Sequence, residues 1–381
     1  MDCFFVSVER LKNPAVNGLP MVVGGDPKEG RSVVVSASYE ARQFGIYSAM
    51  PIRLALHSCT DLIIVLPDFD IYQYYHRKIE GILRTFSPLV EMASIDEGYI
   101  DLSGTDRLWG PPMEAGERLR WAIKQATQLD CTVGIASTKT TAKIASQKAK
   151  PSGMLWVPLG VESMFLAPLS IKLIPGIGKK MTKLLHSFGL THIHQIASAG
   201  ELLMTSTLGA MGRWLWHASI GYDQSPSFTV RQRKSISREI TFPSDTTDQT
   251  YIIAVLHRLI ERVSSQLRVE RKVAKTVGIK LRYEDFTTVN RAFTLPQFGS
   301  SDFTFFFHAK RLMLSAMDRR VGIRLIGVKL SSFDNVYQAE LFDEEKQLKR
   351  YGRLVVIDQI RRRFGFNSLL MGESVYLAGK E

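Results

Sequence analysis

The chain has 381 residues, 45% of them hydrophobic, with a formal net charge of +12 and a pI of about 9.5. This length exceeds one ordinary domain and predicts two to four domains. No run approaches the ~20 apolar residues that cross a bilayer, and no secretory signal pattern begins the chain, which predicts a cytoplasmic protein without a membrane partner. Three widely spaced cysteines without Cys/His metal spacing predict reduced thiols.

The positive charge favours a polyanionic partner, because Lys and Arg set against phosphates release condensed counterions. A solvated basic surface without a nucleic-acid partner explains the same composition. Charge alone therefore leaves both interpretations open.

The first half of the chain mixes helical and strand-like patterns, which predicts an α/β layer. Residues 89–104 alternate around small and β-branched residues and stop at Ser-Gly, as in a β-hairpin. The other elements expected here are helices at about 70–86, 113–129 and 140–149 and a strand at 131–136.

Strand patterns disappear over 158–226, where short helices are separated by Pro and Gly, and this predicts a small helical domain. A basic linker follows, and its cations are DNA-binding candidates: Arg231, Arg233, Lys234 and Arg238. An α+β domain is then expected, with strands at 235–241, 275–283, 291–295 and 323–330, helices at about 248–270 and 303–318, and a final helix near 354–364.

Asp96 and Glu97 are adjacent acids at the turn of the expected hairpin. Their side chains converge on a metal only where the strand bends into the turn. Such carboxylates can hold two Mg²⁺ ions about 3.5–4 Å apart, which clamp a nucleotide's phosphates and activate a primer hydroxyl. A solvated turn is the alternative.

The two-metal chemistry requires cations that bind a triphosphate. Tyr39 and Arg42 are three residues apart on an expected helix, so the phenol and the guanidinium share one face. Lys150 lies at a helix end just before Pro-Ser-Gly and supplies a point charge. An ordinary surface helix is the alternative for Tyr39 and Arg42.

A hairpin between two short helices reads Pro-Gly-Ile-Gly-Lys-Lys at 175–180. Its glycines allow backbone N–H groups to approach a DNA phosphate, which predicts a helix-hairpin-helix that binds DNA without reading sequence. A simple helical turn is the alternative. The DNA-binding candidates here are Gly176, Gly178, Lys179 and Lys180.

Several segments in chain order together resemble Y-family DNA polymerases, and most of all the polymerase IV (DinB) type. They are M-D-C-F-F-V-S-V-E at 1–9, S-Y-E-A-R at 38–42, S-I-D-E-G-Y-I-D at 94–101, A-K-P-S-G at 149–153, K-S-I-S-R-E at 234–239 and R-L-I-G-V-K-L at 324–330. The resemblance covers nearly the whole chain.

The resemblance implies a multidomain α/β and α+β fold, a right-hand polymerase with a palm, fingers, a helical thumb and an α+β little finger. The expected bounds are 1–10 and 69–157 for the palm, 11–68 for the fingers, 158–226 for the thumb with its helix-hairpin-helix, 227–234 for the linker, 235–336 for the little finger and 337–381 for a C-terminal segment. Error-prone translesion synthesis without proofreading, by a monomer acting on primer–template DNA and deoxynucleoside triphosphates, is the implied activity.

The resemblance also assigns roles to single residues. Asp96 binds metal, Glu97 binds metal and supports catalysis, and Tyr39, Arg42 and Lys150 hold the triphosphate. The remaining implied residues are Phe5 as the steric gate against ribonucleotides, Ser36 in the nucleotide pocket and the backbone carbonyl of Met1 as a metal ligand.

One departure concerns the family's first motif, in which two acids are separated by one residue. The first acid, a metal ligand, precedes the position of Met1, so we expect an internal start or a truncated product. Asp2 matches the second acid, and we expect it to cap the helix that begins near Cys3 rather than to bind metal, with a metal role as the alternative.

Gln338, Leu341 and Phe342 form a Q-x-x-L-F pattern, which resembles the peptide that docks bacterial polymerases on the sliding clamp. An ordinary strand-to-helix connection is the alternative.

Two further functions compete with DNA synthesis. A catalytically impaired DNA- and clamp-binding protein is consistent with the absent first acid. A palm-like cyclase shares the metal carboxylates, but it leaves the helix-hairpin-helix and the basic linker unexplained.

Overall fold

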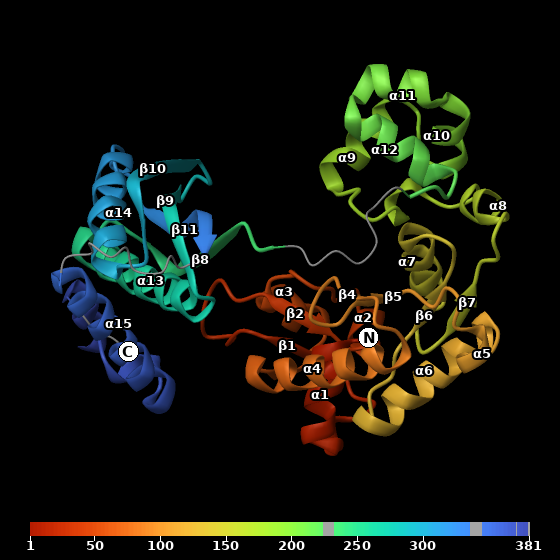
Figure 1. The fold of residues 1–381 in the computed structure, drawn as a ribbon, viewed down its shortest axis with the longest axis horizontal. Helices are drawn as coiled ribbons and strands as arrows, with labels where there is room; N and C mark the ends of the chain where they lie inside the picture. Colours follow the sequence, from red (N-terminus) through yellow and green to blue (C-terminus); the bar gives the residue numbers. More distant parts are fainter. Residues whose placement is uncertain (224–231, 336–344, 371, 380–381) are drawn as a thin grey trace. The chain divides into compact units, whose positions relative to one another are not determined.

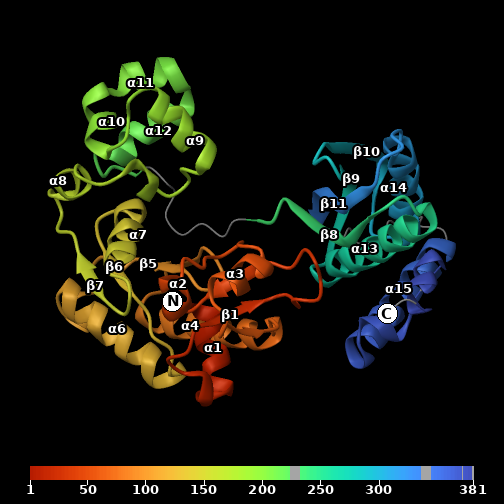
Figure 2. The ribbon, with the colours of Figure 1, turned by 180° about the vertical axis from the view of Figure 1, so that it is seen from behind.

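The computed structural model describes residues 1–381 except 224–231, 336–344, 371 and 380–381. The chain divides into two compact units, Met1–Val230 and Arg231–Glu381. Both units mix helices with β-sheet (Figures 1 and 2). Among the described residues, no helix is long and apolar enough to cross a membrane.

The first hydrophobic core of unit 1 is built from helices and two short sheets. Its elements are α1 (Phe4–Lys12), α4 (Phe69–Phe86), α5 (Asp106–Trp109), α6 (Pro112–Thr127), β4 (Val90–Met92), β5 (Gly98–Ile100) and β6 (Val133–Ile135). Strand β7 (Met154–Trp156) pairs with β6, and α7 (Lys139–Lys148) packs against both strands. Buried Ile79 and Leu83 on α4, and Leu119 and Ile123 on α6, repeat every four residues and face this core. This spacing confirms the predicted helical faces.

The second core of unit 1 surrounds a three-stranded sheet. Its elements are β1 (Met21–Gly24), β2 (Val34–Ala37), β3 (Ile63–Val65), α2 (Tyr39–Gln43) and α3 (Ile52–Ser58), while a 3-10 helix (Pro14–Val16) packs against the first core through Val16. Strand β1 pairs antiparallel with β2 and parallel with β3. Met21 and Val23 pack in the first core and Val22 in the second, because successive strand side chains point to opposite faces. Strand β1 therefore joins the two cores.

The third core of unit 1 is helical. Its elements are α8 (Glu162–Leu166), a 3-10 helix (Ile171–Leu173), α9 (Lys179–Ser187), α10 (Ile193–Ala199), α11 (Glu201–Leu208) and α12 (Ala210–Ser219). Ile171, Leu185, Ile196 and Leu215 are fully buried in it, and Ile144 of α7 joins them. As predicted, the described residues of 158–226 form helices and no strand.

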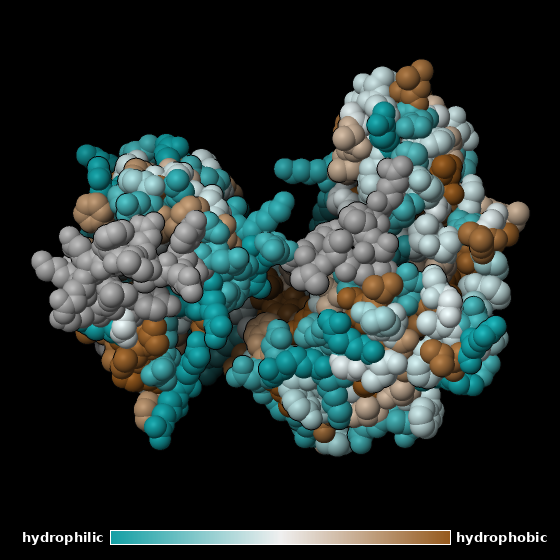
Figure 3. Space-filling view, in the orientation of Figure 1, coloured by the Kyte–Doolittle hydropathy of each residue, from teal (hydrophilic) through white to brown (hydrophobic). Residues whose placement is uncertain are grey.

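Unit 2 contains a four-stranded antiparallel sheet in the order β10-β9-β11-β8. Its elements are β8 (Ser235–Thr246), α13 (Gln249–Val269), β9 (Lys272–Tyr283), β10 (Thr288–Gly299), α14 (Asp302–Ala316) and β11 (Ile323–Asn335). These elements confirm the predicted α+β order, with longer strands than expected. Helices α13 and α14 share one core with the sheet, and hydrophilic side chains gather where β8 lies (Figure 3).

The C-terminal segment of unit 2 packs on α13 through buried charges. It contains α15 (Glu345–Phe364) and two 3-10 helices (Phe366–Ser368 and Gly372–Gly379). Arg361 forms an ion pair with Glu261, and Arg268 pairs with Asp302 and, at 2.7 Å, with Asp358. All five side chains are less than 9% exposed. The predicted final helix is therefore an integral part of unit 2.

Candidate active site

Asp96 and Glu97 lie in the turn between β4 and β5, as the sequence predicts. The strands pair Val90 with Ile100 and Met92 with Gly98, and the turn closes with Ala93 N–H donating to the Glu97 carbonyl at 2.9 Å. The Asp96 carboxylate accepts a hydrogen bond from Ser94 Oγ at 2.8 Å. Both carboxylates remain accessible to solvent.

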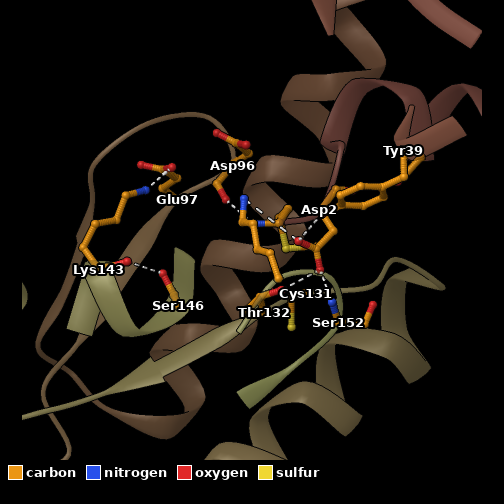
Figure 4. Close-up of polar contacts among 12 residues, drawn as sticks. Asp2, Tyr39, Asp96, Glu97, Cys131, Thr132, Lys143, Ser146 and Ser152 are labelled. Atoms are coloured by element: carbon orange, nitrogen blue, oxygen red, sulfur yellow. Dashed lines mark hydrogen bonds and ion pairs between the residues drawn. The ribbon is translucent and has the colours of Figure 1, made fainter. Parts of the chain in front are cut away.

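Helix α7 brings two lysines against this hairpin. Lys143 Nζ forms an ion pair with Oε1 of Glu97 (Figure 4). Lys139 Nζ lies 2.9 Å from Oε2 of Glu91 on β4. The sequence analysis missed Lys143, although its position four residues after Lys139 on one helical face was a usable signal.

A cavity of about 560 Å³ opens beside the turn, and residues of both the predicted metal site and the predicted triphosphate site line it. Asp96, Glu97 and Lys143 line it together with Met1 and Lys150. The hairpin carboxylates therefore share one cavity with Lys150, a residue predicted to bind the triphosphate.

Met1 lies directly beside the hairpin turn. Its α-amino group donates a hydrogen bond to the Asp96 carbonyl at 2.8 Å. The structure thus places the Met1 backbone next to Asp96.

Asp2 does not cap helix α1, which corrects the expectation from the sequence. Cys3 occupies the N-cap position, and no side chain caps the helix. The Asp2 carboxylate is buried and accepts hydrogen bonds from Thr132 Oγ1 at 2.7 Å and from Ser152 N–H at 2.9 Å. A capping carboxylate would accept hydrogen bonds from N–H groups of its own helix, but the partners of Asp2 lie 130 and 150 residues away in the sequence.

Tyr39 and Arg42 lie on helix α2 and contact each other. The Arg42 guanidinium carbon is 5.1 Å from the centre of the Tyr39 ring, and Arg42 Nε donates to the Ala37 carbonyl at 3.2 Å. The helix begins at Ser38, whose hydroxyl accepts from Ala41 N–H at 3.1 Å. This arrangement confirms the shared helical face that the sequence predicts.

Burial raises the pKa of the Tyr39 phenol, and the neighbouring Asp2 carboxylate raises this pKa further. Tyr39 OH lies 3.3 Å from Asp2 Oδ1, and Lys150 Nζ lies 4.0 Å from the same oxygen. Two of the three residues predicted to bind phosphate, Tyr39 and Lys150, therefore lie beside one acid, and Arg42 contacts the Tyr39 ring.

Phe5 and Ser36 lie in the same unit on α1 and β2. The Phe5 ring is half-buried against Tyr72 at 4.4 Å and Phe69 at 6.0 Å between ring centres. Ser36 is buried at 9% exposure and pairs with Val23 of β1 in the sheet register. Among the described hydrogen bonds, none joins the Ser36 side chain to another predicted site residue. Tyr72 and Phe69, which contact the Phe5 ring, are not predicted site residues either.

Two acidic side chains of the hairpin turn are available to the predicted Mg²⁺ ions. Asp96 and Glu97 supply accessible carboxylate oxygens, the ligands that Mg²⁺ prefers. Within the described residues, no group of three or more His, Cys, Asp or Glu side chains is arranged to hold a metal. The residues present fit a cation at Asp96 and Glu97, and they supply two carboxylates for the predicted pair of ions.

The predicted helix-hairpin-helix lies at the start of α9. Gly176 adopts a positive φ of 93°, which favours glycine, and Gly178 is the N-cap residue of the helix. Lys179 and Lys180 are exposed in its first turn. The first N–H groups of a helix have no acceptor within the helix, so this helix start offers donors that suit a phosphate.

The other predicted DNA-binding cations belong to the start of unit 2. Arg233 forms an ion pair with Glu270 at 2.5 Å, while Lys234 and Arg238 are exposed. Arg231 and the Q-x-x-L-F residues Gln338, Leu341 and Phe342 lie outside the described residues.

Comparisons with known proteins all identify the same protein family. Residues 1–147 match the impB/mucB/samB family, and residues 233–341 match the impB/mucB/samB family C-terminal domain. A DNA polymerase IV of Dehalococcoides mccartyi (strain CBDB1) is 38% identical over 379 residues, which cover 99% of this chain and 96% of the relative. A DNA polymerase IV of Streptomyces coelicolor is 36% identical over 345 residues, covering 90% of this chain and 71% of the relative.

Solved structures lead to the same family. A Y-family DNA polymerase chimera of Dbh and Dpo4 has a TM-score of 0.77 and 28% identity, covering 87% of this chain and 96% of that chain. An insertion ternary complex of Dbh DNA polymerase has a TM-score of 0.60 and 27% identity, with the same coverage. The chain therefore belongs to the impB/mucB/samB family, as a Y-family DNA polymerase of the DinB type.

Proposed function

We propose that this chain is a template-directed DNA polymerase that performs error-prone translesion synthesis without proofreading. The observation that carries the proposal is the shared cavity, which brings Asp96 and Glu97 together with Lys150. Tyr39 and Arg42 extend the same group through Asp2 and the Tyr39 ring. Metal-binding carboxylates and phosphate-binding cations around one cavity suit phosphoryl transfer from a nucleoside triphosphate.

The four cores support a division into polymerase domains. We assign 1–10 and 69–157 to the palm, 11–68 to the fingers, 158–226 to the thumb, 227–234 to the linker, 235–336 to the little finger and 337–381 to the C-terminal segment. The first, second and third cores of unit 1 correspond to the palm, fingers and thumb, and the core of unit 2 to the little finger.

Asp96, Glu97 and the Met1 carbonyl are the proposed ligands of two Mg²⁺ ions. When bound, these ions neutralise phosphate charge and lower the pKa of the primer's 3′-hydroxyl. The hairpin fixes both carboxylates at one turn, and the hydrogen bond from Ser94 orients Asp96. Lys143 balances the charge of Glu97 until the cation binds.

Tyr39, Arg42 and Lys150 are proposed to hold the triphosphate. Arg42 offers two parallel N–H bonds, Lys150 a point charge and Tyr39 a protonated hydroxyl. Phe5, held by Tyr72, is proposed to exclude the 2′-hydroxyl of a ribonucleotide, and Ser36 to line the pocket. Contacts of this kind distinguish deoxyribose from ribose without recognising the identity of the base.

Primer–template DNA is the proposed partner of the thumb and of the start of unit 2. Gly176, Gly178, Lys179 and Lys180 would contact the backbone, as would Arg231, Arg233, Lys234 and Arg238. Two solved structures of Dbh DNA polymerase are an insertion ternary complex and a post-insertion binary complex. We further propose a cytoplasmic monomer that docks on a sliding clamp through Gln338, Leu341 and Phe342.

A second candidate function is a DNA-binding protein with impaired catalysis. The number of carboxylates favours this function. Among the described residues, no third acidic side chain forms a group with Asp96 and Glu97 that could hold a metal. Such a protein would bind primer–template DNA but extend the primer no faster than its Asp96→Asn variant.

Template direction is the property that separates a polymerase from the alternatives. Four primer–templates differ only in the first templating base. Each is incubated with one nucleotide at a time, for all four nucleotides in turn, at saturating Mg²⁺. A polymerase adds the complementary nucleotide fastest on each template. Addition of the same nucleotide on all four templates, or of none, contradicts the proposal. A mismatched primer end that stays undegraded during the same incubation supports the absence of proofreading.

A further inference from the structure

Asp2 is the buried acid at the junction of three segments of unit 1. Its Oδ2 atom accepts hydrogen bonds from Thr132 Oγ1 at 2.7 Å and from Ser152 N–H at 2.9 Å. Its Oδ1 atom faces Tyr39 OH at 3.3 Å and Lys150 Nζ at 4.0 Å. Asp2 itself is only 4% exposed, so these partners replace its hydration.

The two carboxylate oxygens have different neighbours. Thr132, just before β6, and the Ser152 backbone hold Oδ2 and thereby fix the side chain (Figure 4). Oδ1 remains for Tyr39 and Lys150, which come from α2 and from the end of α7. One acid therefore joins two proposed triphosphate ligands that are 111 residues apart in the sequence.

The third ligand is reached through the Tyr39 ring. The Arg42 guanidinium carbon lies 5.1 Å from the ring centre, so a displaced ring removes a contact of Arg42. Because burial and Asp2 raise the pKa of the Tyr39 phenol, the hydroxyl keeps its proton, and it donates this proton to Asp2 Oδ1, which fixes the direction of the hydroxyl.

We propose that Asp2 is a positioning residue for the triphosphate: its carboxylate sets the Tyr39 hydroxyl, the Lys150 ammonium and, through the ring, Arg42 in the geometry that receives the nucleotide. This role replaces helix capping and metal binding for Asp2. It rests on the proposed nucleotide-binding function of those three residues.

Asp2→Asn tests the inference, because it keeps the size of the side chain and one acceptor oxygen but removes the charge. The Kd of dATP is measured on the protein bound to a dideoxy-terminated primer opposite a templating T, so that binding is read without turnover. We expect the Kd to rise about tenfold, the effect of weakening a charged hydrogen bond. The Kd of the primer–template should stay within about twofold, since Asp2 is assigned no DNA contact.

Glu9→Gln is the matched control. Glu9 is also 4% exposed and lies on α1, and its carboxylate accepts from Tyr72 OH at 2.7 Å and pairs with Lys12 at 3.0 Å. It contacts none of the three triphosphate ligands among the described contacts. Its substitution should therefore leave the dATP Kd unchanged while costing comparable thermal stability.

A double-mutant cycle tests whether Asp2 acts through Tyr39. In a Tyr39→Phe background, Asp2→Asn should raise the Kd by a smaller factor than in the native chain, because the Tyr39–Asp2 contact is already absent. If Asp2→Asn does not fold, Thr132→Val decides the question. That variant removes one bond that fixes Asp2 but keeps the charge, and we expect a rise of about threefold.

The outcomes separate this inference from the proposed function. Native protein that binds dATP, with Asp2→Asn or Thr132→Val binding it equally well, overturns the positioning role alone. An equal rise in Glu9→Gln also overturns it, because the effect would then follow stability. Failure of the native protein to bind dATP above its binding of a mismatched nucleotide overturns the proposed function itself.

Discussion

The ammonium group of Lys143 forms an ion pair with Oε1 of Glu97, so one of the two proposed metal ligands already has a positive partner. The pair joins the middle of α7 to the hairpin turn, and both side chains are partly exposed, at 27% and 40%. A divalent cation that binds Glu97 must compete with this ammonium group.

Lys143→Met should therefore raise the affinity of the DNA-free protein for Mn²⁺. A partly exposed pair of this kind contributes about 0.2–1 kcal/mol, which corresponds to a roughly 1.4- to fivefold change in Kd. Titration followed by the electron paramagnetic resonance of free Mn²⁺ measures it.

Lys139→Met provides the comparison, since Lys139 lies one turn earlier on α7 and pairs with Glu91 instead. An equal change in both variants would mean that overall charge, rather than the Glu97 contact, controls the affinity.

Phe5→Ala should weaken discrimination against ribonucleotides. The Phe5 ring is held 4.4 Å from Tyr72, and its removal opens space where the sugar is proposed to lie. The ratio of kcat/KM for a deoxynucleotide to that for its ribonucleotide should fall at least ~10-fold, equivalent to about 1.4 kcal/mol. This ratio is independent of the fraction of active protein, so a loss of stability does not affect it. An unchanged ratio rejects the gate assignment.

Replacing Lys179 and Lys180 with Ala should weaken binding to DNA of any sequence. Each lost phosphate contact should reduce the slope of log K against log salt by about one unit. Lys124→Ala is a control of equal charge change for either single substitution, Lys179→Ala or Lys180→Ala, because Lys124 lies on α6 and pairs with Asp130 at 2.9 Å. Fluorescence anisotropy at several salt concentrations gives the slopes, and a loss that depends on sequence would argue against the backbone-contact assignment.

Arg361→Met should destabilise unit 2 by about 3–5 kcal/mol, because Glu261 would remain buried without its partner. Arg361→Met combined with Glu261→Leu should recover most of this loss, since no unpaired charge is then buried. Lys280→Met removes an exposed pair with Glu239 and should cost less than about 1 kcal/mol. Hydrogen exchange of α13 amides in the full chain reports each free energy. Similar exchange in Arg361→Met and Lys280→Met would show that α15 does not depend on this pair.

Local periodicity was sufficient to predict much of the fold. The helices α4, α6 and α13 and the hairpin that carries Asp96 and Glu97 follow from apolar spacing and turn residues. The sheet of β1, β2 and β3 was missed; β1, for example, is buried at all four positions and so lacks the alternation of apolar and polar residues that marks a strand.

Contacts between distant residues could not be predicted in this way. Asp2 stands where a helix cap is expected, yet its partners Thr132 and Ser152 are distant in the sequence. Glu261 and Arg268 have the polar character of an exposed helix face, but α15 covers them. In each case a tertiary partner of opposite charge or matching hydrogen-bonding capacity decides the environment of the side chain.

The central claim is that Asp96 and Glu97 carry the chemistry of nucleotide addition and not the binding of DNA. Single-turnover incorporation of one complementary nucleotide at saturating Mg²⁺ tests it, with the Kd of primer–template measured in parallel. Glu91→Gln, on the same hairpin but paired with Lys139, is the matched control.

In this single-turnover measurement, we predict that the native chain extends the primer and that Glu91→Gln does so at a similar rate. Asp96→Asn and Glu97→Gln should each be at least ~100-fold slower, a loss of about 2.7 kcal/mol, with the DNA Kd within about twofold of the native value. Extension by either variant at the native rate, or a native chain no faster than Asp96→Asn, would contradict the assignment of catalysis to this turn.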